Sequence, residues 1–168
     1  MYIVSLRSYL GQCFTFFGKP AEEAAWCHYD NDTANGAKYG KLYNWYAVSD
    51  SRGLAPVGYH IPSDAEWTIL TDYLGVEKNA GAKMKSKQGW AKDGNGTNSS
   101  GFSGLPGGKR LEGGPFASIG KDGWWWSSTG FSSPYYFAWS LSLYYSNGVV
   151  YWNYSYKAKG FSVRCLRD

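Results

Sequence analysis

Two histidines and three cysteines are the side chains in this sequence that could serve as nucleophiles, general bases or metal ligands. His28 lies in Trp-Cys-His-Tyr-Asp and His60 in Gly-Tyr-His-Ile-Pro, and neither has a second ligand at metal-binding spacing. A nucleophilic pair could be drawn from Cys27 or Cys165 with His60, but no spacing supports it. Structural histidines beside aromatic residues are the commoner case, so we expect no catalytic residue, metal site or cofactor.

The other short motifs also give no support for catalysis. The sequence contains no Gly-x-Ser-x-Gly, His-Glu-x-x-His, P-loop or Gly-x-Gly-x-x-Gly pattern. Asp30-Asn31-Asp32 resembles the start of a calcium loop, but the Gly expected at position six and the Glu at position twelve are missing. A solvated turn is the better interpretation, although calcium binding stays open. Whether Cys13 pairs with Cys27 also stays open, because three cysteines allow at most one disulfide.

Aromatic residues dominate the composition, with 9 Trp, 15 Tyr and 8 Phe among 168 residues. Between residues 131 and 158 Tyr is mixed with Ser, Asn and Gly, and almost no charge occurs between Lys121 and Lys157. This mixture is typical of antibody paratopes, where Tyr gives a large contact area and small polar residues give adaptable hydrogen bonds. An ordinary β-surface is the alternative, but such a surface does not require the loss of charge. We predict a ligand-binding face that includes Ser132, Tyr135, Tyr136, Ser140, Ser142, Tyr144, Ser146, Asn147, Tyr151, Asn153, Ser155 and Tyr156.

Length and charge exclude several classes of protein. A chain of 168 residues fits one domain. The net charge of +4 comes from scattered basic residues, concentrated only at Lys83, Lys85 and Lys87, which we interpret as a solvated helix end. Nucleic-acid binding would need a continuous basic stripe among the aromatic residues. The apolar runs are far shorter than the ~20 residues that span a bilayer. We therefore expect neither a nucleic-acid partner nor membrane insertion.

One helix is well defined by the sequence. Ser63 can cap its first turn while Glu66 bonds back to the Ser63 amide, which is a capping box. Apolar residues follow at helical spacing and Gly75 can end the helix, so we expect a helix from about Asp64 to Leu74. Its apolar stripe consists of Trp67, Leu70 and Leu74. We predict that this stripe packs on Phe161 and Val163, that a second helix covers 77–86, and that a strand covers 2–6.

The last 45 or so residues change to a period of two, which is typical of strands. Alternation around Trp139 predicts a half-buried strand with Ser140 and Ser142 facing solvent. Asn147-Gly148 predicts a tight two-residue hairpin, because both residues tolerate positive φ. The buried scaffold is expected to include Trp125, Trp126, Trp139, Phe161, Val163 and Cys165, and the irregular stretch 88–120 is expected to be pinned by Trp90, Phe102 and Leu105.

Five sequence blocks are distinctive as an ordered set. They are Tyr39-Gly40-Lys41-Leu42-Tyr43-Asn44-Trp45-Tyr46-Ala47-Val48, Leu54-Ala55-Pro56 with Gly58-Tyr59-His60-Ile61-Pro62-Ser63-Asp64-Ala65-Glu66-Trp67, Gly101-Phe102-Ser103-Gly104-Leu105-Pro106-Gly107-Gly108, Trp125-Trp126-Ser127-Ser128-Thr129 and Gly160-Phe161-Ser162-Val163-Arg164-Cys165. In this order they resemble the Fibrobacter succinogenes major paralogous domain, and the resemblance covers about 26–168. It implies an α+β fold of the C-type-lectin-like, formylglycine-generating-enzyme type, with small twisted antiparallel sheets, two helices and much irregular loop. Residues 1–25 would form an atypical N-terminal segment, with a strand packed on the domain, and residues 26–168 the ligand-binding domain.

The same resemblance suggests a function. The segment 131–158 is similar to the variable region of diversity-generating retroelement proteins, which implies a non-enzymatic protein that displays a diversified binding face to an unknown protein or cell-surface ligand. Extracellular or cell-surface localisation would fit that family. The paired cysteines of formylglycine-generating enzymes are missing, which argues against that oxidase activity and makes an oxidase the third alternative. The calcium-binding Glu-Pro-Asn of true lectins is also missing, which argues against sugar binding through calcium. An invariant adhesion or glycan-binding domain is the second.

Overall fold

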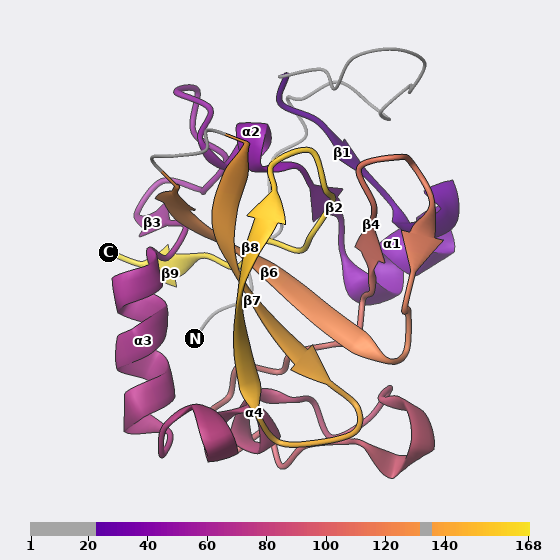
Figure 1. The fold of residues 1–168 in the computed structure, drawn as a ribbon, viewed down its shortest axis with the longest axis vertical. Coiled ribbons are helices and arrows are strands. Elements are labelled where there is room, and N and C mark those ends of the chain that lie inside the picture. The colour runs from indigo at the N-terminus through magenta and orange to yellow at the C-terminus, as the bar shows by residue number, and fades with distance from the viewer. Residues whose placement is uncertain (1–22, 132–135) are drawn as a thin grey trace.

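The structure is a computed structural model that describes residues 23–131 and 136–168 (Figure 1). The strand expected over 2–6, Cys13 with its pairing, Ser132 and Tyr135 lie outside these ranges. The helices are α1 (Thr33–Tyr39), α2 (Trp45–Val48), α3 (Asp64–Tyr73) and α4 (Glu77–Met84), with short 3-10 turns at Tyr29–Asn31 and Ala91–Asp93. The strands are β1 (Trp26–Cys27), β2 (Leu42–Tyr43), β3 (Tyr59–His60), β4 (Lys109–Arg110), β5 (Phe116–Ala117), β6 (Asp122–Gly130), β7 (Phe137–Tyr144), β8 (Val150–Tyr156) and β9 (Leu166–Arg167).

The described strands form small antiparallel sheets. The largest has the order β6-β7-β8, and the pairs β1-β2, β3-β9 and β4-β5 form two-stranded sheets. Helices and small sheets are therefore mixed, as expected for an α+β chain. The expectation of two helices is incomplete, because α1 and α2 are also present. These two helices span 7 and 4 residues, which is too short for an apolar period to be recognised.

Helix α3 begins as its capping box predicts. The Ser63 amide donates to Oε2 of Glu66 at 2.9 Å, and the Glu66 amide donates to Oγ of Ser63 at 3.3 Å. Two backbone donors of the first turn are thereby satisfied. Helix α4 follows directly and ends at Met84, two residues before the expected end.

Each face of the β6–β8 sheet contacts a different core, and Figure 1 shows α3 and α4 on one side of this sheet with β1, β2 and α1 on the other. The helical core lies under α3 and α4 and includes Trp67, Leu74, Met84, Phe102, Trp125, Leu141, Leu143 and Val150. The second core includes Trp26, Tyr43, Ala47, Trp124, Trp126, Ala138, Phe161 and Cys165. The prediction that the α3 stripe packs on Phe161 and Val163 is wrong, because these residues belong to the second core. Phe102, from the irregular stretch, covers Trp67 instead, with ring centroids 5.7 Å apart.

The irregular stretch 88–120 is held by buried rings, as predicted for Trp90 and Phe102. The indole Nε1 of Trp90 donates to the Gly104 carbonyl at 3.1 Å, and Phe102 has no exposed surface. Leu105 is only half-buried. A long loop of this kind is ordered by packing and by internal hydrogen bonds instead of by regular elements.

The β7–β8 hairpin is present, but its connection is wider than predicted. Residues 145–149 separate the strands, and neither Asn147 nor Gly148 has a positive φ. The connection is shaped by α4 instead. The Ala82 amide donates to the Gly148 carbonyl at 3.3 Å, and Nζ of Lys85 donates to the Asn147 carbonyl at 2.9 Å. Lys85 is therefore buried, and the prediction that it lies on a solvated helix end is wrong.

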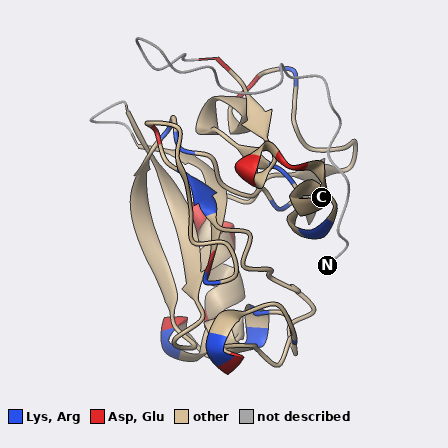
Figure 2. Ribbon diagram, turned by 90° about the vertical axis from the view of Figure 1, so that its right-hand side faces the viewer, with Lys and Arg blue, Asp and Glu red and all other residues tan. Residues whose placement is uncertain are grey.

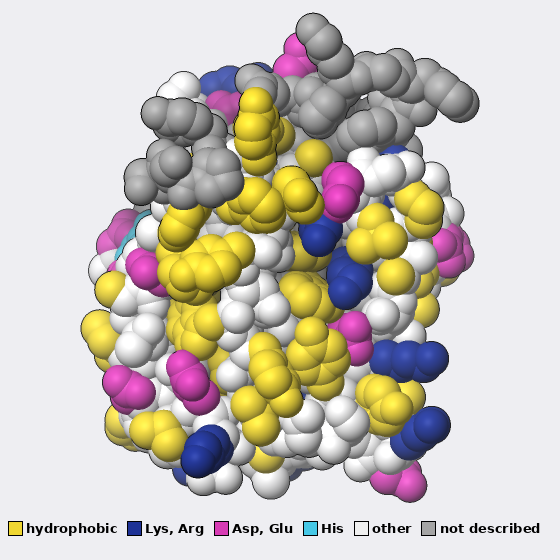
Figure 3. All heavy atoms as spheres, viewed as in Figure 1, with side chains coloured by type: hydrophobic (Ala, Val, Ile, Leu, Met, Phe, Trp, Pro, Cys, Tyr) yellow, Lys and Arg dark blue, Asp and Glu magenta, His cyan; other side chains and the backbone are white. Residues whose placement is uncertain are grey.

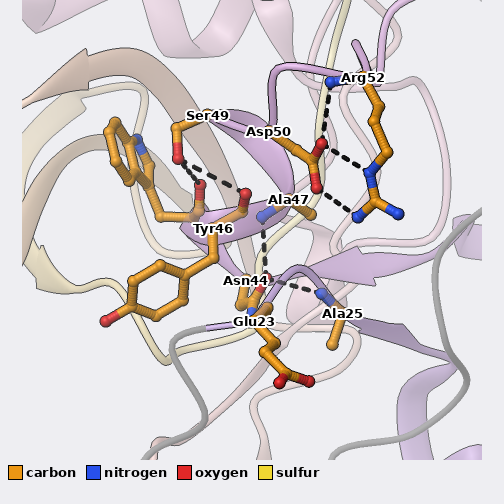
Figure 4. Close-up of polar contacts among 9 residues, drawn as sticks. Glu23, Ala25, Asn44, Tyr46, Ala47, Ser49, Asp50 and Arg52 are labelled. Carbon is orange, nitrogen blue, oxygen red and sulfur yellow. Dashed lines mark hydrogen bonds and ion pairs between the residues drawn. The ribbon is translucent and has the colours of Figure 1, made fainter.

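A buried asparagine joins the start of the described chain to α2 (Figure 4). Oδ1 of Asn44 accepts from the Ala47 amide at 3.0 Å, which caps α2, and from the Ala25 amide at 3.0 Å. Its Nδ2 group donates to the Glu23 carbonyl at 2.7 Å. Because Asn44 has no exposed surface, these bonds satisfy polar groups that water does not reach.

Candidate binding surface

Strands β7 and β8 contain most of the predicted contact residues, and their register decides which side chains share a face. Ser140 lies opposite Trp126 of β6, and Ser142 lies opposite Trp124. Both serines are fully buried, so the prediction that they face solvent is wrong. The physical reason is size, because the large indoles of β6 fill the second core and leave space only for small side chains on the neighbouring strand.

The buried hydroxyls on this face are hydrogen-bonded. Oγ of Ser140 lies 3.0 Å from Oγ of Ser155, and Oγ of Ser142 accepts from Nδ2 of Asn153 at 3.0 Å. Ser155 is also buried, which makes its predicted contact role wrong as well. These hydroxyls stabilise the pairing of β7 with β8 and contribute nothing to a solvent-facing surface.

The opposite face of the same strands carries paired aromatic rings. Phe137 lies opposite Tyr156 with ring centroids 4.3 Å apart, and Trp139 lies opposite Tyr154 with centroids 4.1 Å apart. Phe131 adds an edge-on contact to Tyr154 at 5.0 Å. We name this set the aromatic ladder, and it consists of Phe131, Phe137, Trp139, Trp152, Tyr154 and Tyr156.

Apart from Trp152, which packs against the helical core, the aromatic ladder is not part of the two large cores. Leu141 and Val150, on the same face, are buried in the helical core, whereas Trp139 and Trp152 are only half-buried. The assignment of Trp139 to the buried scaffold is therefore wrong. The exposed tyrosines of the segment 131–158 among the described residues are Tyr136 at 60%, Tyr154 at 55%, Tyr156 at 43% and Tyr151 at 38%. Hydrophobic side chains gather along the face that β8 crosses in the space-filling view (Figure 3).

A second group of predicted residues surrounds the β7–β8 connection. The rings of Tyr144 and Tyr151 meet edge to face at 5.1 Å, and Nδ2 of Asn147 donates to the Tyr151 hydroxyl at 3.2 Å. Ser146 is exposed, and Tyr144 and Asn153 are half-buried. Partial burial raises the pKa of the Tyr144 hydroxyl, and a hydrogen bond with Ser142 opposes this shift.

The aromatic ladder continues into a hollow. A pocket of about 380 Å³ is lined by Tyr136 and Tyr156 together with Tyr46, and its other lining residues are Glu112, Gly113, Lys157 and Ala158. The Lys157 ammonium lies 4.4 Å from the ring centroid of Trp45, which places it beside the aromatic wall. The structure thus brings together Tyr136 and Tyr156 from the predicted set with residues outside the 131–158 segment.

Sequence reasoning missed Tyr46 and five ladder residues, namely Phe131, Phe137, Trp139, Trp152 and Tyr154. Of these five, Trp139 was assigned to the buried scaffold because of its size. A usable signal was the pairing of large residues across β7 and β8, because a hairpin register counted from 147–148 puts these side chains on one face. Tyr46 follows β2 in the chain and reaches the surface only through the tertiary fold.

Cys165 and His60, which were considered for catalysis, and Asp32, from the motif considered for calcium, make packing contacts and hydrogen bonds within the fold. Cys165 is buried in the second core, and burial raises the pKa of its thiol to about 11, so it is a core thiol as predicted. Nδ1 of His60 lies 2.6 Å from Oδ1 of Asp168, and its Nε2 lies 2.7 Å from Oε1 of Glu66. These two hydrogen bonds raise the pKa of His60. Asp32, from the motif considered for calcium, caps α1 through the Ala34 amide at 2.8 Å.

Residues 23–131 and 136–168 contain no group of three or more His, Cys, Asp or Glu side chains that could hold a metal ion. Within the same ranges, none of the helices has the length and apolar character that crossing a bilayer requires.

The profile of the Fibrobacter succinogenes major domain matches residues 11–167. The chain belongs to this family. The family match extends over both cores and the aromatic ladder, so these are parts of a single Fibrobacter succinogenes major domain. A search of curated proteins and a search of solved structures each found no match.

Proposed function

We propose that this Fibrobacter succinogenes major domain is a non-enzymatic ligand-binding protein whose contact surface is the aromatic ladder together with Tyr136. The observation that carries the proposal is the exposure of Tyr154 and Tyr156 on the ladder face of the edge strand β8, where they pair with Trp139 and Phe137. Tyr144 and Tyr151 lie on the opposite face of the sheet, beside the β7–β8 connection. Contiguous exposed aromatic side chains are uncommon on a monomeric surface and mark interaction sites. Tyr is also the residue that contributes most contact area for little loss of rotamer entropy.

The near absence of charge on the sheet supports a partner whose contact surface is uncharged, either apolar or polar. No Lys, Arg, Asp or Glu occurs between residues 123 and 156, and the long strands are free of charged residues over that range (Figure 2). An uncharged surface has no long-range steering, so contact area and hydrogen bonds from Tyr and Asn side chains would provide the affinity. A protein or cell-surface ligand fits this chemistry.

The proposal also covers the origin of the surface. We propose a C-type-lectin-like scaffold in which residues 131–158 are rewritten by a diversity-generating retroelement. The separation of buried positions, such as Ser140 and Ser142, from exposed ones, such as Tyr154 and Tyr156, supports it, because only exposed positions tolerate many side chains. Under this proposal the rewritten codons are those of the exposed residues.

The DNA around the gene tests the origin. We expect a reverse transcriptase gene nearby and a template repeat of the codons for 131–158, with adenines where the exposed residues differ. A template whose substitutions fall equally on the codons of Ser140, Ser142 and Ser155 would contradict the assignment. Absence of any template would favour the invariant adhesion domain.

A display library tests the binding function directly. Randomising Tyr136, Trp139, Tyr154 and Tyr156 and selecting against streptavidin is expected to yield binders, because the side chains form one contact surface. The matched control randomises four exposed positions of α3, namely Ala65, Thr68, Ile69 and Asp72. Equal yields from both libraries, or loss of folding throughout the first library, would contradict the proposal.

A further inference from the structure

A second and larger pocket lies between α1, β2 and the segment before β9. Its volume is about 510 Å³, and it shares no residue with the aromatic ladder or with the tyrosine-lined pocket. The lining residues are His28, Gly36, Ala37, Lys38, Tyr39, Gly40, Lys41, Tyr43, Ser103, Gly104, Leu105, Trp125, Ser162, Val163 and Arg164. A volume of this size lies within the range of small-molecule sites.

The charges of this lining have one sign. Lys38, Lys41 and Arg164 are basic, His28 adds an imidazole, and none of the described lining residues is Asp or Glu. Ser103 and Ser162 add hydroxyl groups. A concave surface with several cations and no acidic side chain concentrates a positive potential inside it.

Arg164 is the most constrained of these cations. Its guanidinium carbon lies 4.6 Å from the ring centroid of Phe102, and Nη2 donates to the Phe102 carbonyl. Its Nε is buried without a hydrogen-bond partner among the described residues, and burial lowers the pKa of the guanidinium. No Asp or Glu of the described residues forms an ion pair with Arg164. A partly buried cation without a counter-ion is costly, and a bound anion would remove that cost.

The pocket walls are fixed in position. The imidazole of His28 packs so closely on Gly36 that a Cβ there would lie 2.0 Å from Nδ1. The Lys41 ammonium lies 3.6 Å from the ring centroid of Trp26. Apolar surface from Tyr43, Trp125 and other rings completes the lining. This combination of apolar rings and cations suits a ring that carries one anionic group.

From this geometry we infer that the pocket binds a small organic acid, of the size of an acidic monosaccharide, through an ionised carboxylate placed near Arg164, Lys38 and Lys41. The charged residues of the pocket hold the anion, and the aromatic wall packs against the ring of the ligand. The inference does not rest on the binding function of the aromatic ladder, because the two sites share no residue.

Titration calorimetry at low ionic strength with D-glucuronate, D-glucose and sodium sulfate tests the inference on the full chain. We expect saturable binding of glucuronate, none of glucose, and weaker binding of sulfate that competes with glucuronate. The Trp125 ring in the wall provides an independent fluorescence signal. Equal affinity for glucose, affinity for sulfate at least as high as for glucuronate, or no glucuronate binding would each overturn the inference.

Variants locate the site. Arg164→Gln is expected to weaken glucuronate binding at least tenfold, and Lys38→Gln, at an exposed position that keeps the fold, several-fold. Lys87→Gln removes the same charge from an exposed residue outside the pocket and is the matched control. If Lys87→Gln weakens binding as much as Lys38→Gln does, the effect is non-specific and the inference fails.

Discussion

Trp139 of β7 and Tyr154 of β8 lie directly opposite each other, with ring centroids 4.1 Å apart, and yet more than half of the Tyr154 surface is open to solvent. The pair is therefore a surface contact that is held in place by the hairpin. A partner that covers the pair would bury both rings without any rearrangement of the strands.

Replacing Tyr154 by Ser tests how much stability this pair provides. The change removes ring contacts to Trp139 and Phe131 but no buried volume, so we expect a loss of about 1 kcal/mol in the free energy of unfolding. Trp126→Ala, in the second core, is expected to cost about 3 to 5 kcal/mol. Urea denaturation measures both values. Equal losses would show that Tyr154 is part of the core.

Replacing Ser142 by Tyr tests the burial of the serine face. Ser142 is fully buried opposite Trp124, so we expect overpacking to reduce the free energy of unfolding by about 1 to 3 kcal/mol or more. The same substitution at exposed Ser146 is expected to change it by no more than about 0.5 kcal/mol. Thermal melting followed by circular dichroism compares the two variants. If both melted at the wild-type temperature, the burial of Ser142 would be contradicted.

Asn44→Ala removes a side chain that bonds three backbone groups, those of Ala25, Ala47 and Glu23. The Ala47 amide loses its partner inside the protein, whereas Ala25 is half-buried and Glu23 is exposed, so we expect a loss of about 1 to 3 kcal/mol in the free energy of unfolding. Ser49→Ala, at an exposed residue that ends α2, is the matched control and is expected to cost less than about 0.5 kcal/mol. A mild effect of Asn44→Ala in urea titration would mean that water replaces the lost bonds.

His60 is expected to make stability depend on pH. Hydrogen bonds to Asp168 and Glu66 raise the pKa of His60 above 6.5 in the folded chain. The contribution of His60 to the free energy of unfolding is therefore fully present below about pH 6 and is lost as the pH rises through the raised pKa. We expect the stability difference between the wild type and His60→Gln to be larger at pH 5.5 than at pH 9. Denaturation at both pH values measures it, and a difference that grows toward pH 9 would refute the assigned contacts.

Local sequence determined the elements whose signals lie within a few residues. The Ser63–Glu66 capping box gave the start of α3 correctly, because both partners of each bond lie in one turn. The antiparallel pairing of β7 with β8 followed from alternation on both sides of one connection. Composition, with Tyr mixed with Ser, Asn and Gly and few charges, identified the segment 131–158 that contains Tyr136, Tyr151 and Tyr156.

Only the tertiary structure decided which face of β7 meets solvent. Alternation places Trp139 and Ser140 on opposite faces of β7, but it does not predict which face is covered by other parts of the protein. The answer depends on Trp124 and Trp126 of β6, whose rings occupy the second core and require serine beside them. It also depends on the helical core under α3 and α4, which buries Leu141 and Val150 on the ladder face but leaves Trp139 half-buried and Tyr154 and Tyr156 exposed. Such contacts join residues far apart in the chain, and their packing overrides any pattern within a single strand.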